Sequence, residues 1–192
     1  MNFYYTMYRP LNVLAISLTL FLFSCTPTVK PFYHGTFFPE DNIYRNTSLR
    51  FLMSFRGNWD IVTDPNHMSR SNRDFALELQ KSGIDLLFVG STVEGLHGTR
   101  AIAANYNKPA LEYALSIQEL NIGYIQNDRG FTDLTDEIEL VRWIYEKSGF
   151  TFTEYFVAID TYNIRFAFWT TPDLFERFLP VYEGIIGTLQ LY

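Results

Sequence analysis

The stretch GSTVEGLHGTR, residues 90–100, brings together side chains that could do acid–base chemistry in this 192-residue chain. It carries Ser91, Glu94, His97 and Arg100. Such groups transfer protons only when they lie within hydrogen-bond reach of one another and of a substrate. Glycines flank the histidine and favour a mobile, solvated connection, so we expect an ordinary loop here. The alternative is a hydrolase or a small-ligand-binding site that uses this loop.

Motifs for the common catalytic and metal centres are absent from the sequence. It has no His-Glu-x-x-His pair, no paired cysteines, no P-loop and no Gly-x-Ser-x-Gly elbow. The three histidines lie in separate segments: His34, His67 and His97. One further charged stretch is typical of a solvated loop: Asp128, Arg129, Asp133 and Asp136. We therefore expect no catalytic residue, no metal and no cofactor, and a protein that is not an enzyme.

The single cysteine, Cys25, ends the most apolar run of the chain, which begins near Leu11. The run is about 13 to 15 residues long, short of the roughly 20 that cross a bilayer as a helix. Arg9 precedes the run and the small Ser24 lies directly before the cysteine. A basic start, a short apolar stretch and a small residue before a cleavage site are typical of a secretory signal.

The quartet Leu22, Phe23, Ser24 and Cys25 resembles the bacterial lipobox, although Phe23 stands where that motif prefers a smaller residue. The resemblance implies a signal peptide over residues 1–24, translated from Met1 or Met7, and a lipid on Cys25. An uncleaved anchor, a plain signal peptide and a buried free thiol are the alternatives.

Anchoring at Cys25 implies a cell-envelope protein that meets the membrane through its lipid. Thr26 follows the cysteine, which by resemblance to lipoprotein sorting rules favours the periplasmic face of the outer membrane, where the organism has one. Residues 25–43 hold three prolines and a glycine, so we expect a tether that leads into one domain over residues 44–192.

Composition narrows the classes of partner. Removing residues 1–25 takes away only Arg9 of the 15 basic residues, which leaves 14 against 21 acidic ones and a net charge of −7. Nucleic acids bind basic patches, and no lysine or arginine cluster occurs, so we expect no nucleic-acid partner. Aromatic residues make up 18% of the chain, which suits a packed core and sheet faces.

Periodicity predicts alternating strands and helices in the first part of the domain. Residues 49–56 and the apolar run 84–91 read as strands, and residues 98–106 read as a partner of the second. Residues 69–83 predict a helix capped by Ser71 or Asn72 and stopped at a glycine. A second helix is expected to begin at Pro109.

The C-terminal half predicts a strand meander and a final helix. Residues 136–147 favour a strand narrowly over a helix. Residues 151–160 and 162–170 are β-rich and nearly adjacent, so we expect an antiparallel pair. Residues 172–189 have one broad apolar face that includes Phe178, and Pro180 should kink or split this helix.

Three segments carry a family resemblance: YRNTSLRFLMSFRGNWDI, DLLFVG and YNIRFAFWTTPDLFERFLPVYEGIIGTLQL. In order and aromatic pattern they look like the PsbP-like α/β/α sandwich, a family that includes an extrinsic photosystem II protein, a Ran-binding transport factor and small bacterial lipoproteins. The resemblance implies an α+β fold, with a central, mainly antiparallel sheet and helices on both faces. It also implies a non-enzymatic binding or accessory module with a protein partner in the envelope. It transfers no functional residue to this chain.

Overall fold

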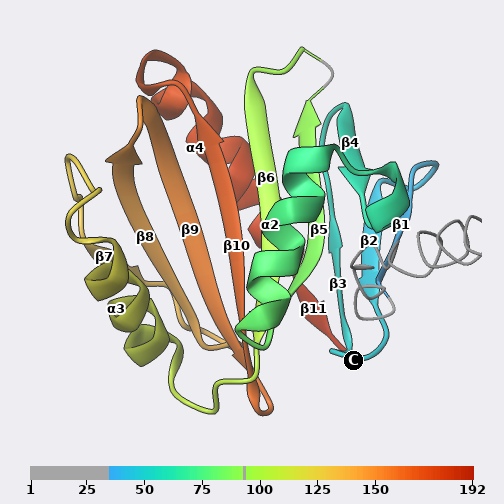
Figure 1. The fold of residues 1–192 in the computed structure, drawn as a ribbon, viewed down its shortest axis with the longest axis horizontal. Coiled ribbons are helices and arrows are strands. Elements are labelled where there is room, and N and C mark those ends of the chain that lie inside the picture. Colours follow the sequence, from blue (N-terminus) through green and yellow to red (C-terminus); the bar gives the residue numbers. More distant parts are fainter. Residues whose placement is uncertain (1–34, 93) are drawn as a thin grey trace, which may run out of the picture.

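The computed structural model describes residues 35–192 apart from Val93, so Cys25 and the predicted signal peptide lie outside the described residues. Two antiparallel sheets form the domain (Figure 1). The large sheet has the order β4-β5-β6-β10-β9-β8-β7 and the small sheet has the order β1-β2-β3-β11. The strands are β1 Gly35–Phe38, β2 Ile43–Asn46, β3 Phe51–Ser54, β4 Trp59–Val62, β5 Ile84–Thr92, β6 His97–Ala104, β7 Phe131–Asp133, β8 Leu140–Lys147, β9 Phe150–Ile159, β10 Tyr162–Thr170 and β11 Gln190–Leu191.

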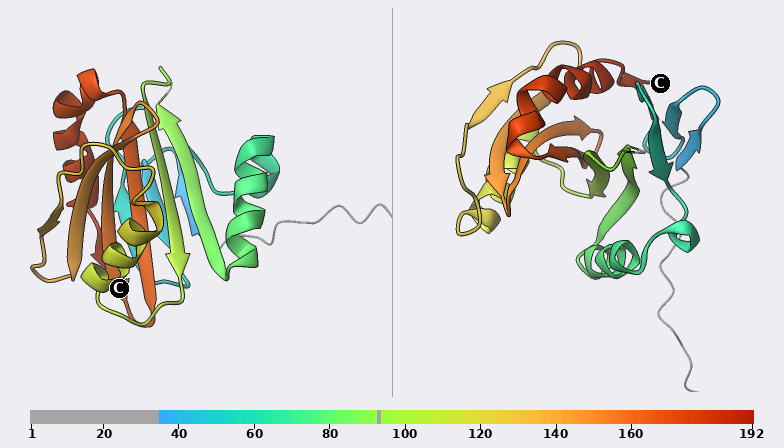
Figure 2. Two further views of the ribbon diagram at one scale, coloured as in Figure 1. Left: turned by 60° about the vertical axis from the view of Figure 1, so that its left-hand side comes forward. Right: turned by 90° about the horizontal axis from the view of Figure 1, so that it is seen from above.

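Helices cover both faces of the large sheet. The helices are the short η1 Pro65–His67, α2 Arg70–Lys81, α3 Ala110–Asn121 and α4 Pro172–Ile186. Helices α2 and α3 lie on one face and α4 lies on the other (Figure 2). The expected α+β architecture, a central antiparallel sheet with helices on both faces, is confirmed. None of the helices in residues 35–192 is long and apolar enough to span a membrane.

Strand β10 shows how one strand serves two different faces. Phe166 and Phe168 are fully buried in the core shared with α4 and the small sheet. Arg165 and Trp169 alternate with them and project to the side of α2 and α3. Because β10 pairs with β6 on one edge and β9 on the other, this alternation sets the two faces of the whole sheet.

Most of the predicted elements are confirmed. Residues 136–147 resolve as strand β8 from Leu140 onward, as narrowly favoured. The turn into β9 consists of Ser148 and Gly149, both with positive φ, which is the backbone of a tight hairpin turn. Strands β9 and β10 form the expected antiparallel pair through the two-residue link at 160–161.

The prediction that the domain begins near Tyr44 was wrong. Strand β1 lies before that residue and already pairs with β2. Gly35 lies against the ring of Tyr44, and a Cβ there would be 2.2 Å from the tyrosine hydroxyl oxygen. The glycine that suggested a tether is therefore required by a close contact inside the fold.

Helix boundaries differ from the predictions by small shifts. The cap of α2 is Ser69, whose hydroxyl accepts a hydrogen bond from the Asn72 amide at 3.2 Å. Pro109 is the cap of α3 rather than its first residue. Helix α4 runs without a break through Pro180, so it is not split. Pro180 has no N–H, so the carbonyl one turn earlier in the helix receives no hydrogen bond from it. Pro180 lies on the exposed side of α4, where water can bond to that carbonyl instead.

The buried side of α4 gives a direct test of the core. Phe175 is fully buried against the aromatic residues of the sheet, whereas Phe178 is only partly buried. We expect Phe175→Ala to lower the free energy of unfolding by about 3 to 5 kcal/mol, the range for truncating a buried phenylalanine. Chemical denaturation measures this. Leu120→Ala, at a residue that is 76% exposed, is the control and should change stability by less than about 0.5 kcal/mol. Equal losses in the two variants would contradict the assigned core.

Candidate functional site

The four groups of residues 90–100 do not converge on one site. His97 and Arg100 both lie on β6, but His97 contacts Tyr182 on α4 whereas Arg100 lies over Phe75 on α2. Residues three apart in a strand point to opposite faces, so the sheet separates the imidazole from the guanidinium. Ser91 and Arg100 line one hollow, and His97 also borders it, but the imidazole is hydrogen-bonded to Tyr182 on the other face of the sheet. The exposed Glu94 lines a second hollow, again with His97.

His97 is a buried link between the sheet and α4, so the prediction of a solvated loop was wrong for this residue. Its Nδ1 and the Tyr182 hydroxyl are joined by a hydrogen bond of 2.6 Å. Its ring packs edge-on to that of Phe178, with centroids 3.6 Å apart. Burial lowers the pKa of His97 below its usual 6.5, Glu94 acts in the opposite direction, and Arg177 adds to the lowering. The neutral imidazole is therefore the form that the fold selects.

The second charged stretch has structural partners. Asp128 accepts hydrogen bonds from the Trp143 indole at 2.9 Å and from the Gln118 amide at 2.6 Å. Burial raises the pKa of Asp128, but these bonds and one from the Gly130 amide outweigh it, and the net shift is downward. Arg129 forms an ion pair with Glu176 at 2.6 Å.

The other polar residues considered as catalytic or metal-binding candidates do not form a site together. Asp133 caps the turn at Thr135, and Asp136 is exposed. His67 is exposed beside Asp64, and His34 lies outside the described residues. Within residues 35–192, apart from Val93, no three histidine, cysteine, aspartate or glutamate side chains gather as metal ligands.

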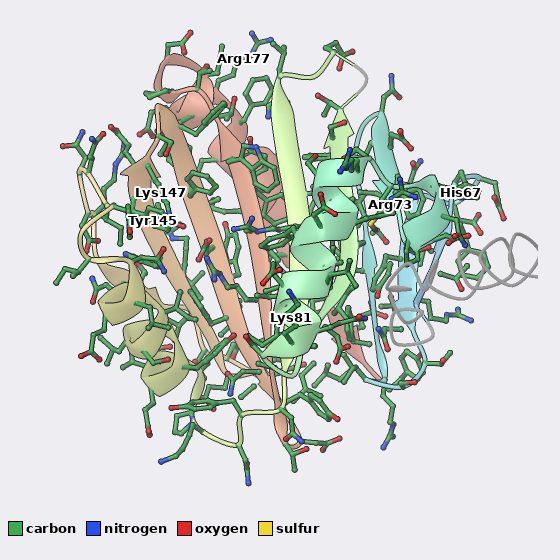
Figure 3. The ribbon with its side chains drawn as sticks, viewed as in Figure 1. His67, Arg73, Lys81, Tyr145, Lys147 and Arg177 are labelled. Carbon is green, nitrogen blue, oxygen red and sulfur yellow. The ribbon has the colours of Figure 1, made fainter. Side chains whose placement is uncertain are left out.

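A groove runs over the large sheet on the face that carries α2 and α3, from the side of α2 to Asn121 at the end of α3. Two adjoining hollows of 470 and 390 Å³ form it, and both are lined by Phe75, Arg100 and Phe150. In Figure 1, strands β9, β10 and β6 lie uncovered between the two helices. Figure 3 places Tyr145 and Lys147, which line the smaller hollow, on the α3 side of this surface.

The floor of the groove is a row of residues from four neighbouring strands. Gly98, Trp169, Phe152 and Tyr145 are successive cross-strand partners in β6, β10, β9 and β8. Phe152 and Tyr145 stack with centroids 5.3 Å apart, and Phe152 and Trp169 are 5.8 Å apart. A Cβ on Gly98 would be 2.1 Å from the Trp169 ring, so only glycine lets the indole lie against β6.

An ion pair lies beside this row on the same face of the sheet, because Glu154 follows Phe152 by two residues in β9. Glu154 is fully buried, and its carboxylate accepts hydrogen bonds from Arg165 at 2.5 and 2.7 Å and from the Tyr145 hydroxyl at 2.9 Å. The Glu154 carboxylate raises the pKa of Arg165 against the effect of burial. A buried carboxylate needs such partners to remain charged.

Arg100 lies in the groove without a carboxylate bound to it. Its guanidinium carbon is 5.1 Å from the Phe75 ring centroid and 5.8 Å from that of Trp169. Burial is the main cause that lowers the pKa of Arg100, and Arg165 adds to it while Glu154 opposes it. The guanidinium nonetheless stays charged, because an arginine pKa lies far above neutral pH. The prediction that Arg100 belongs to a solvated loop was therefore also wrong.

The outer side of α3 carries an apolar stripe. Leu111 is 45% exposed, Leu115 is 47% exposed and Ile122, just past the helix, is 76% exposed. Their spacing of four and seven residues places them on one side of the helix. Leu120 and Tyr124 are exposed nearby, so five of the ten large apolar residues exposed in the described chain lie between residues 111 and 124.

Comparison with solved structures identifies the architecture. The solution structure of cyanobacterial PsbP from Synechocystis sp. PCC 6803 superposes with a TM-score of 0.55 over 89% of this chain and 99% of that chain, at 11% identity. The fold is PsbP-like. A crystal structure from Bacteroides thetaiotaomicron VPI-5482 matches with a TM-score of 0.44 over 74% of this chain and 45% of that chain, at 12% identity. No family model and no curated protein sequence matches the chain.

Sequence reasoning found this PsbP-like fold but missed the groove. Trp169, Phe152 and Tyr145 lie in three separate segments of the sequence, and nothing in any one segment indicates that they share a surface. The signal lies in the pairing register, which brings the three residues opposite one another. Alternation in each strand was readable, but the register between strands was not.

The buried His97 predicts a pH-dependent stability. Its pKa is lowered on folding, so the unfolded chain binds the proton first as pH falls. The free energy of unfolding should therefore fall as pH drops through about 6.5, by at most about 1.4 kcal/mol per pH unit. His97→Gln should lose this contribution. Urea titrations at pH 8.0 and 5.5 measure it, with His67→Gln as the exposed control. Identical pH dependence in His97→Gln and the unsubstituted protein would contradict this role.

Proposed function

We propose that this protein is a non-enzymatic binding or accessory module of the cell envelope, anchored by a lipid on Cys25, that docks a partner protein on the outer side of α3. The observation that carries the docking part is the apolar stripe of Leu111, Leu115 and Ile122. Exposed apolar side chains gathered on one surface are typical of protein-binding sites. The inner side of α3 is already used by the fold, because Tyr113, Ala114 and related residues pack on β8 and β9.

The dispersed polar candidates support a binding role over a hydrolase. A hydrolase that used residues 90–100 would need the imidazole and a second polar group at one reacting atom. The sheet lies between His97 and Arg100, and the imidazole is engaged by Tyr182. We therefore assign His97 a structural role, in which it links the sheet to α4, rather than a role in proton transfer.

The position of Cys25 supports anchoring close to the membrane. Nine residues separate it from Gly35, where β1 begins. A fully extended chain of that length spans at most about 30 Å. A lipid on Cys25 would therefore hold the domain within reach of other proteins at the same membrane surface.

Anchoring is tested by Cys25→Ser. The substitution should remove the acceptor for the lipid, so the product should be unprocessed or released from the membrane fraction. Mass spectrometry of the purified protein should show lipid mass on a chain that begins at Cys25, and this mass should be absent from the variant. An unmodified Cys25 within an intact chain would contradict the anchor and leave the docking proposal to its own test.

Docking is tested by a photoreactive p-benzoylphenylalanine in place of Leu111 in living cells. Irradiation should yield one crosslinked product of defined mass, which the added substitution Leu115→Lys should reduce at least about fivefold, because a charge opposes burial of the stripe. The same photoreactive residue at Leu191, which is 44% exposed in the small sheet, is the positional control.

Three outcomes would overturn the docking proposal. The first is equal crosslinking from positions 111 and 191. The second is a product that Leu115→Lys leaves unchanged. The third is a product at twice the mass of the protein, which would assign the stripe to self-association.

A further inference from the structure

The groove between α2 and α3 has the size of a small-molecule site. Its two hollows, of 470 and 390 Å³, share three lining residues and form one continuous surface. Small-molecule pockets usually measure about 300 to 1,000 Å³ and combine apolar walls with a few polar groups.

Positive charge in the groove is only partly neutralised. Arg165 is paired with Glu154. Within residues 35–192, apart from Val93, no hydrogen bond or ion pair engages the Arg100 guanidinium. Lys147 donates to the amide oxygen of Asn121 at 2.9 Å rather than to a carboxylate. Asp60 is the one acidic residue that lines either hollow. In a chain of net charge −6, this is a local cationic site.

The aromatic residues hold Arg100 in a fixed position. The guanidinium lies between the rings of Phe75 and Trp169, and Trp169 is itself fixed against Gly98. An arginine fixed in this way loses little further freedom on binding, which favours affinity. Beside it, Trp169 and Phe152 offer a flat apolar surface.

We propose that this groove binds a small organic anion in which a carboxylate, sulfonate or phosphate group is attached to a flat apolar ring system. The anionic group accepts hydrogen bonds from Arg100, and Lys147 adds a second positive charge. The ring lies against Trp169 and Phe152. This site is separate from the outer side of α3, so its test does not depend on the proposed partner protein.

Three matched probes separate the parts of the proposal. Naphthalene-2-sulfonate has both the ring and the charge, naphthalene-2-sulfonamide has the ring without the charge, and methanesulfonate has the charge without the ring. Isothermal titration of the full-length protein in detergent, with empty micelles as the blank, should show binding of the first probe. The second should bind at least about tenfold more weakly, and the third should show no measurable binding.

Substitution of Arg100 locates the anionic group. Arg100→Gln should weaken naphthalene-2-sulfonate binding about 10- to 100-fold, the loss expected for hydrogen bonds to a charged group. Arg177→Gln, on the exposed side of α4, is the matched control and should bind like the unsubstituted protein. Where Arg100→Gln does not fold, as judged by circular dichroism, Lys147→Gln replaces it with an expected loss of about threefold.

Indole NMR signals locate the ring. The probe should shift the indole N–H signal of Trp169 and leave that of Trp59, on the α4 face, unchanged. Equal affinity for the sulfonate and the sulfonamide, unchanged affinity in Arg100→Gln, equal losses in Arg100→Gln and Arg177→Gln, or a shift of Trp59 alone would each overturn the proposal.

Discussion

The buried carboxylate of Glu154 is the constraint around which the open face of the sheet is organised. A carboxylate without solvent must be paired and hydrogen-bonded, or its charge is strongly unfavourable. Arg165 on the adjacent strand and the Tyr145 hydroxyl meet this requirement from both sides. The three side chains tie β8, β9 and β10 together beside the row of Trp169, Phe152 and Tyr145. Because Arg165 is held in this pair, Arg100 and Lys147 are the cations of the groove that are not paired with a carboxylate.

The two faces of the large sheet differ in structure. Successive side chains along each strand point to opposite faces, so each face has its own set of residues. The α4 face is closed: aromatic rings from both sheets form one buried cluster, in which Phe168 stacks on Tyr182 of α4. His97 lies in this core as a neutral group. The opposite face is covered at its two sides by α2 and α3 and open between them (Figure 2). The largest buried cluster lies on the first face, whereas the second has two smaller clusters under α2 and α3 and partly exposes Arg100 and Trp169 between them.

Helix α3 contributes to both the apolar stripe and the groove. Its buried residues pack on the sheet, its exposed stripe includes Leu111 and Leu115, and its last residue, Asn121, lines the groove and accepts a hydrogen bond from Lys147. An anion in the groove and a protein on the stripe would therefore contact the same helix from different sides. A PsbP-like fold alone does not select either ligand, since one architecture carries many functions.

Local features of the sequence determined the strands, the helices and the α+β class, because periodicity and turn residues act over a few neighbouring positions. The hairpin at Ser148 and Gly149 is an example. Lipidation of Cys25 also follows from local pattern and stays a prediction. The tertiary structure decided the rest. Burial of His97 needs α4, the contact of Gly35 with Tyr44 needs the β1–β2 pairing, and the aromatic row needs the register of four strands. These are contacts between residues distant in sequence, which single-strand patterns do not encode.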